Sequence, residues 1–80
     1  MTREEAFAKL DEVFQDIFDD DTIHVKDETT AADIKGWDSL EHINLVVAVE
    51  QKFGIEFNTE EVNSFKNVGE MMDTILKRVS

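Results

Sequence analysis

Residues 36–41 read Gly36-Trp37-Asp38-Ser39-Leu40-Glu41, and they mark the start of a helix that carries a serine in its first turn. Asp38 is a favoured N-cap residue, and Glu41 follows three positions later, where a capping box places its second acid. Ser39 is the first residue inside this cap. We therefore predict that its hydroxyl faces solvent, where a bulky group can be attached without disturbing a core.

The residues after this start continue the pattern of a single helix. Apolar side chains recur at spacings of three and four, although the run 45–49 taken alone resembles a buried strand, because β-branched residues favour sheets. The capped start, the helix-ending Gly54 and a length of about 15 residues favour a helix instead. We predict a helix over residues 39–53 with one apolar stripe, made of Leu40, Ile43, Val46, Val47, Val49 and Phe53.

Three more capped starts divide the rest of the chain into helices. Their cap residues, with the acids three positions later, are Thr2 with Glu5, Asn58 with Glu61, and Asn67 with Glu70. Apolar residues at helical spacing follow each start, over residues 3–18 in the first case, and we expect Val62 and Phe65 of the short third helix to face inward. The fold class predicted is all-α: a small four-helix bundle with a long loop between helices 1 and 2 and a short third helix.

The segment between the first two predicted helices shows no lasting helical period. It predicts a loop of about 18 residues, which is long for a compact domain. We expect the isolated apolar residues Ile23, Val25 and Ile34 to hold this loop against the core. The stretch from Thr30 to Asp33 is expected to add a short helical turn.

The composition is strongly acidic. Among 80 residues, 19 Asp and Glu against eight Lys and Arg give a net charge of −11. This charge disfavours nucleic acids and anionic membranes as partners and favours proteins with basic patches. No cysteine is present, and no apolar run reaches the ~20 residues of a membrane span. We predict one domain over residues 1–80, a monomer and, because the first residues lack an apolar signal region, a cytoplasmic location.

The residues present do not fit three other kinds of site. A calcium loop that starts at Asp19 has His24 at its sixth position, where glycine is needed, and Thr30 at its twelfth, where glutamate is needed. A zinc site would have only His24 and His42 and no thiolate. Ser39 lacks the Gly-x-Ser-x-Gly elbow of hydrolases. We therefore predict neither a metal site nor a catalytic residue.

Two stretches of the chain resemble the acyl carrier protein family. One is the Asp38-Ser39-Leu40 motif with the apolar helix that follows it, and the other is Glu50-Gln51-Lys52-Phe53-Gly54-Ile55-Glu56-Phe57. The family consists of acidic four-helix bundles of this length, so the resemblance covers essentially the whole chain. It implies that Ser39, flanked by Asp38 and Leu40, carries a 4′-phosphopantetheine arm taken from coenzyme A. The thiol of that arm would hold acyl or aminoacyl thioesters, so the chain itself is expected to catalyse no reaction.

The resemblance also implies a set of partners. These are a phosphopantetheinyl transferase and the acyl-loading, elongating or transferring enzymes of fatty-acid, lipid or polyketide-type biosynthesis, which dock through basic patches. Besides the residues at the motif, the contacts carried over to this chain are Glu41, Asn44, Val47 and Glu50. The common fatty-acid pattern has an acid where Asn44 stands, and more acids where Gln51 and Lys52 stand. Because charge selects partners, we infer a specialised carrier.

Two residues near the serine have two interpretations each. Trp37 either covers the loop against the bundle or contacts the arm. His42 is placed on the more exposed side of the helix, where it is either solvated or able to contact the phosphodiester when charged. Candidates to line the space between the helices are Phe7, Phe14, Leu45, Val46, Val49, Phe65, Met71 and Ile75. A tightly packed core is the default, so short or polar cargo is favoured over a long buried chain.

Two alternatives to an acyl carrier stay open. A peptidyl carrier usually has glycines directly before its serine motif, where this chain has Trp37 and Asp38. An aminoacyl or peptidyl carrier of a secondary pathway is therefore the second interpretation. The third is an acidic helical adaptor that never receives the arm.

Overall fold

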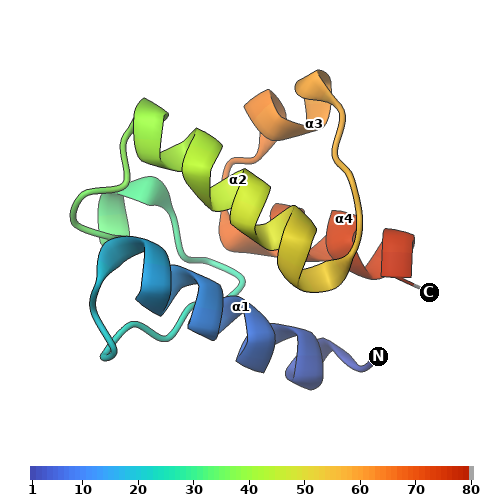
Figure 1. Cartoon of the computed structure of the whole chain (residues 1–80), viewed down its shortest axis with the longest axis horizontal. Coiled ribbons are helices and arrows are strands. Elements are labelled where there is room, and N and C mark those ends of the chain that lie inside the picture. Colours follow the sequence, from blue (N-terminus) through green and yellow to red (C-terminus); the bar gives the residue numbers. More distant parts are fainter. Residues whose placement is uncertain (80) are drawn as a thin grey trace.

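The computed structural model describes residues 1–79, and these residues form four α-helices and one short 3-10 helix (Figure 1). The elements are α1 (Arg3–Phe18), η1 (Ala31–Asp33), α2 (Ser39–Phe53), α3 (Thr59–Ser64) and α4 (Val68–Val79). No strand occurs between residues 1 and 79. The predicted all-α bundle, its long crossover between α1 and α2 and its short α3 are confirmed.

The helix starts follow the predicted caps, but the box is reciprocal at only two of the four predicted starts. At α4, Asn67 Oδ1 accepts from the backbone N–H of Glu70 at 2.9 Å, while Glu70 Oε1 accepts from the backbone N–H of Lys66 at 3.1 Å. Reciprocal capping boxes form at Thr2 for α1 and at Asn58 for α3. At α2 only half of the predicted box is present: Asp38 Oδ1 accepts a bond from the backbone N–H of Glu41 at 2.9 Å. The backbone N–H of Asp38 instead donates to the carbonyl of Gly36 at 3.1 Å, so the Glu41 side chain is not needed as its acceptor.

The core lies where α1 packs against α2 and α4 (Figure 1). Its fully buried side chains include Leu10, Phe14, Leu45, Met71 and Ile75. In contrast, α3 contains no buried residue and lies at the edge of the bundle (Figure 1). Val62 and Phe65, which were predicted to face inward, are half-buried. Burial of apolar area stabilises a helix in place, so α3 is the least firmly packed of the four helices.

The long crossover is tied to the bundle as predicted. Val25 is buried, and Ile23 and Ile34 are half-buried against the core. Polar side chains of α1 add two hydrogen bonds: Asp11 accepts from the backbone N–H of Val25 at 2.7 Å, and Gln15 donates to the carbonyl of Ile23 at 2.9 Å. The crossover therefore has a defined path that ends directly before α2.

The predicted apolar stripe of α2 divides into two faces. Leu45, Val46 and Val49 are buried, as predicted for a core stripe. Three other members of the stripe are exposed instead, namely Leu40 (71%), Ile43 (53%) and Val47 (46%). The helix turns roughly 100° per residue, so these positions lie on the side opposite the buried residues. The prediction of one continuous stripe is wrong, and α2 presents an apolar face to solvent.

Substitution of Gly69 by alanine is expected to destabilise the fold. Gly69 lies in the first turn of α4, and its N–H donates to the carbonyl of Asp27 at 2.9 Å. An added Cβ would lie 2.9 Å from that carbonyl oxygen and 3.1 Å from Asp27 Oδ1. Elsewhere in a helix, alanine stabilises by up to about 1 kcal/mol relative to glycine. Here the overlap is expected to cost about 1–3 kcal/mol.

Urea unfolding of the Gly69→Ala variant measures this effect. A lower unfolding midpoint with an unchanged slope is the expected result. A variant as stable as the unchanged protein, or more stable, would show that α4 does not approach the crossover this closely.

The ion pair between Glu61 and Arg78 links α3 to α4 and predicts a pH dependence. Glu61 Oε2 lies 2.7 Å from Arg78 Nη2, and the bond from Arg78, followed by the backbone bond within the Asn58 cap, lowers the pKa of Glu61 below its ordinary 4.5. A lowered pKa means that the charged form stabilises the fold above pH 4.5, and that this contribution is lost as the pH falls through the folded value. Glu61→Gln is therefore expected to melt at a lower temperature than the unchanged protein at neutral pH. The difference is expected to shrink at acid pH.

Thermal melts at both pH values test this expectation, with Glu60→Gln as the matched control. Glu60 is the exposed acid next to Glu61 in the same helical turn, so both variants lose the same charge. Equal melting temperatures for the two variants at neutral pH would contradict the prediction.

Candidate functional site

Ser39 is the first residue of α2, and its side chain is exposed. Gly36 shapes the approach to it: a φ of 92° lies in the left-handed region that favours glycine and turns the chain into the cap. Asp38 then closes the helix start by accepting from Glu41. The first-turn N–H groups of Ser39 and Leu40 have no acceptor within the helix. The Ser39 hydroxyl therefore lies at the electropositive end of α2, where a bound anion is stabilised.

Trp37 fixes the loop next to this serine. Its ring lies edge-on to Phe14, the largest fully buried side chain, with ring centroids 5.2 Å apart, and 6.3 Å from the ring of Phe18. Of the two predicted roles, the first is confirmed, since Trp37 covers the loop against α1. Its indole N–H side faces the His42 ring, which lies nearly parallel to it with the ring centroids 5.9 Å apart, so Trp37 also connects the core to the site.

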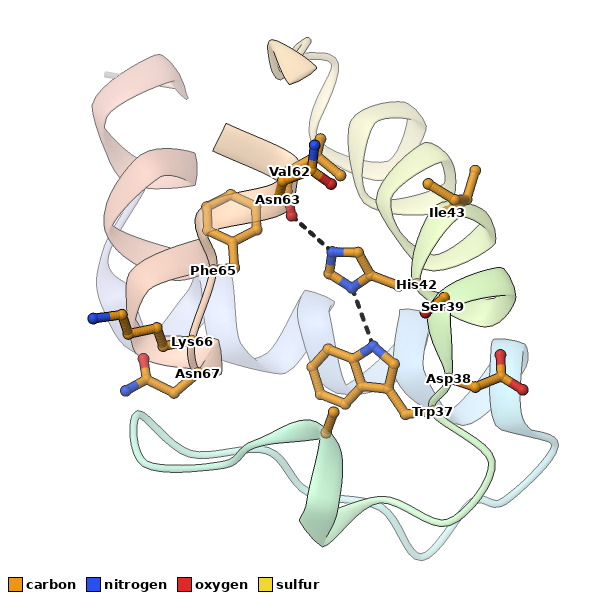
Figure 2. Close-up of a pocket in the computed structure, with 11 residues that line it drawn as sticks. Trp37, Asp38, Ser39, His42, Ile43, Val62, Asn63, Phe65, Lys66 and Asn67 are labelled. Atoms are coloured by element: carbon orange, nitrogen blue, oxygen red, sulfur yellow. Dashed lines mark hydrogen bonds between the residues drawn. The ribbon is translucent and has the colours of Figure 1, made fainter. Parts of the chain in front are cut away.

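His42 is half-buried and bridges two elements (Figure 2). Its Nδ1 lies 3.1 Å from Trp37 Nε1, and its Nε2 lies 2.9 Å from the carbonyl oxygen of Val62 in α3. An indole N–H only donates and a carbonyl only accepts, so a neutral ring with its proton on Nε2 satisfies both partners. The expectation of a merely solvated His42 is wrong. We call this bridge from Trp37 through His42 to Val62 the His42 clasp.

A pocket of about 570 Å³ opens beside Ser39, within the range typical of small-molecule sites (Figure 2). Its walls come from the start of α2, from α3 and the segment after it, and from η1. The lining residues are Ala31, Trp37, Asp38, Ser39, His42, Ile43, Val62, Asn63, Phe65, Lys66 and Asn67. The ammonium group of Lys66 extends outward from this pocket, away from His42 (Figure 2).

The pocket differs from the predicted space between the helices. Of the eight predicted lining residues, only Phe65 lines it. The other seven are buried in the core or packed against it: Phe7, Phe14, Leu45, Val46, Val49, Met71 and Ile75. The pocket is therefore a surface feature above the core. The seven other side chains belong to a packed interior, as expected by default.

The predicted partner contacts occupy the outer side of α2, but they differ in exposure. Leu40, Asn44 and Val47 are exposed, and Glu41 is half-buried. Glu50 accepts a bond from the backbone N–H of Phe57 at 2.7 Å, so its carboxylate supports the turn after α2. Ile43 also belongs to this surface but is absent from the predicted contacts, although its spacing of three from Leu40 and four from Val47 could have indicated it.

The described residues contain neither a metal site nor a membrane-spanning helix. Among residues 1–79, no cluster of three or more His, Cys, Asp or Glu side chains is arranged to hold a metal ion. His24 pairs with Asp11 at 3.2 Å, beside the crossover. Within the same range, no helix combines the length and the apolar character needed to cross a membrane.

Comparison with known proteins identifies the family. The model of the family described as "Phosphopantetheine attachment site" matches residues 8–75. The chain is 33% identical to the acyl carrier protein of Acidothermus cellulolyticus over 75 residues, covering 94% of this chain and 89% of that protein. It is 30% identical to the acyl carrier protein of Thermosynechococcus vestitus over 80 residues. This match covers 100% of this chain and 99% of that protein.

A solved structure gives the same result. The solution structure of the holo acyl carrier protein from Geobacter metallireducens aligns with a TM-score of 0.86 and 40% identity, covering 92% of this chain and 85% of that one. The chain is thus a phosphopantetheine-bearing carrier, and it belongs to the acyl carrier protein family.

Membership of this family settles the class of function. The chain is a carrier rather than an enzyme, and its prosthetic group is a covalently bound 4′-phosphopantetheine. The residues present fit that group, because an exposed hydroxyl stands at a helix N-terminus beside a pocket. The group supplies a thiol for thioester formation, which a chain without cysteine lacks. Family membership further implies interaction with a phosphopantetheinyl transferase and with biosynthetic enzymes.

Proposed function

We propose that Ser39 carries the 4′-phosphopantetheine arm, with Asp38 and Leu40 flanking the attachment point. The observation that carries this proposal is the exposed Ser39 hydroxyl at the capped start of α2. Asp38 holds the cap, so the serine side chain has no part in closing the helix. The N–H groups of Ser39 and Leu40 and the helix dipole stabilise the phosphodiester once it is formed.

The transfer itself requires little of this chain. The Ser39 hydroxyl attacks the β-phosphate of coenzyme A, the bond between the two phosphates breaks, and adenosine 3′,5′-bisphosphate leaves. The transferase supplies the metal ion and the base that takes the hydroxyl proton. What this chain contributes is position, because the serine lies outside the core and a partner's active site can reach it.

The exposed side of α2 is the proposed docking surface for partner enzymes. Leu40, Ile43 and Val47 give it an apolar strip, with Glu41 and Asn44 beside them. Lys52 is paired with Glu12 of α1 at 2.7 Å, so its charge is offset within the chain. The net charge of −11 attracts basic docking patches, and the apolar strip supplies area to bury on contact.

The cargo is proposed to be an acyl group of fatty-acid, lipid or polyketide-type biosynthesis, with an aminoacyl group as the alternative. The neutral Asn44 and Gln51 support a specialised pathway over general fatty-acid synthesis. We further propose that residues 1–80 act as one carrier domain, as a monomer in the cytoplasm.

Incubation with coenzyme A and a broad-specificity phosphopantetheinyl transferase tests the function directly. Intact-mass measurement is expected to show the addition of one phosphopantetheinyl group to essentially every molecule. A mass that stays unchanged, under conditions that modify a known carrier in the same tube, would favour the helical adaptor instead.

A further inference from the structure

The site has two apolar regions at different depths. The surface pocket beside Ser39 has Trp37, Ile43 and Phe65 in its walls. Below it lies the core, in which Leu45 and Met71 are fully buried. A flexible acyl chain attached at Ser39 reaches the surface pocket first, because Ser39 itself lines that pocket.

The His42 clasp lies at this boundary. His42 belongs to α2. Its Nε2 lies 2.9 Å from the Val62 carbonyl oxygen, and this hydrogen bond holds α3 against α2. The bond from Trp37 at 3.1 Å joins the two nearly parallel rings edge to edge and fixes the orientation of His42. Trp37 in turn rests on Phe14 of the core. The His42 ring, which links α2 to α3, is therefore itself held in place by Trp37 and, through it, by the core.

The element that the clasp holds is the most easily moved helix of the bundle. α3 has six residues and buries none of them. Besides the clasp, Arg78 of α4 holds α3 through Glu61, and it bonds to the carbonyl of Glu56 in the segment before α3. Loss of the clasp thus frees the edge of α3 that faces Ser39 while the Arg78 contact keeps the opposite edge in place.

We infer that the His42 clasp limits the length of acyl chain that this carrier shelters, which makes His42 a specificity-determining residue. This inference rests on the proposed function, because it concerns a chain held on the Ser39 arm. With the clasp closed, a short acyl group lies in the surface pocket, and the distal part of a long chain stays in solvent. With the clasp removed, α3 moves aside and a long chain enters the core.

The test compares two acyl groups on three forms of the protein. Hexanoyl and tetradecanoyl thioesters are loaded on the unchanged protein, on His42→Leu, which loses both bonds, and on His42→Gln. The glutamine amide offers one donor and one acceptor, so it can replace both contacts of the neutral imidazole. His24→Leu, at the exposed histidine beside α1, is the matched control.

Two measurements report where the acyl chain lies, and neither depends on a partner enzyme. One is the rate at which hydroxylamine cleaves the thioester, and the other is the set of backbone amide NMR signals that shift on acylation. On the unchanged protein we expect hexanoyl and tetradecanoyl groups to be cleaved at similar rates, with shifts confined to pocket residues such as Ile43 and Asn63. On His42→Leu we expect tetradecanoyl cleavage to slow about tenfold, as extra methylene groups become buried. The amides of Leu45 and Met71 are then expected to shift as well.

Each result has a defined meaning. His42→Gln and His24→Leu should behave like the unchanged protein. Core-amide shifts with tetradecanoyl on the unchanged protein would overturn the inference even if His42→Leu fails to fold, and so would a folded His42→Leu that gives no added protection. Mass spectrometry of every sample separates this inference from the proposed function. An acylated protein with the wrong length dependence overturns the clasp alone, whereas a protein that never gains the arm overturns both.

Discussion

Replacement of Ser39 by alanine is expected to abolish phosphopantetheine transfer completely while the fold stays intact. Transfer requires a hydroxyl at the end of α2, and no other hydroxyl residue occurs between residues 31 and 58. The fold does not depend on Ser39, because Asp38 caps the helix and the serine side chain is exposed. Exposed substitutions of this kind usually change the free energy of unfolding by less than about 0.5 kcal/mol.

Intact-mass spectrometry after incubation with coenzyme A and transferase gives the result. Ser64→Ala is the matched control, since Ser64 is also an exposed helical serine and its hydroxyl only donates to the Glu61 carbonyl. Ser64→Ala should gain the arm to the same extent as the unchanged protein. A Ser39→Ala protein that still gains the arm would place the attachment elsewhere.

The largest expected loss of stability follows from truncation of Phe14. Its side chain is fully buried, and its ring contacts those of Phe18 and Trp37 at 5.9 and 5.2 Å. Phe-to-Ala substitutions at such positions cost about 3–5 kcal/mol, because buried apolar area is lost and a cavity remains. Domains have a total stability of only about 5–15 kcal/mol, so Phe14→Ala is expected to be marginally folded or unfolded at room temperature.

Urea unfolding followed by Trp37 fluorescence measures the free energy of unfolding, and the emission of the folded protein reports the surroundings of Trp37. The Trp37 ring loses its support in the core, so the emission of folded Phe14→Ala should also shift toward that of solvated tryptophan. Phe7→Ala is the comparison: Phe7 is half-buried in the same helix and should cost less. Phe14→Ala within about 0.5 kcal/mol of the unchanged protein would mean that the core does not depend on this ring.

The features that the sequence predicts well are those set by neighbouring residues. Thr2 and Asn58 each meet an acid three positions later, and both capping boxes form where the sequence places them. The bounds of α1 and α2 agree with the predicted ones because caps and apolar spacing act within a few residues. The exposure of Ser39 follows from the same local reasoning. The resemblance to the acyl carrier protein family rested on the serine motif and on local patterns of this kind along the whole chain.

The features that the sequence does not predict depend on contacts between distant residues. His42 bonds to the carbonyl of Val62, 20 positions away, and a backbone acceptor leaves no mark in the sequence. Leu40, Ile43 and Val47 fit a helical stripe, but which apolar side of α2 meets α1 is decided by packing. Glu50 was predicted as a partner contact from the resemblance, and its bond to the Phe57 N–H depends on the path of the turn after Gly54.

Peptide mass spectrometry of the protein purified from its own cells tests the central claim most directly. Trypsin cleaves after Lys35 and Lys52, and the resulting peptide 36–52 contains Ser39 as its single hydroxyl residue. We predict that this peptide carries a phosphopantetheinyl group, with fragment ions that place it on Ser39. Recovery of peptide 36–52 only in its unmodified form, with the protein free of the group elsewhere, would contradict the assignment of Ser39 as the site that holds the cargo arm.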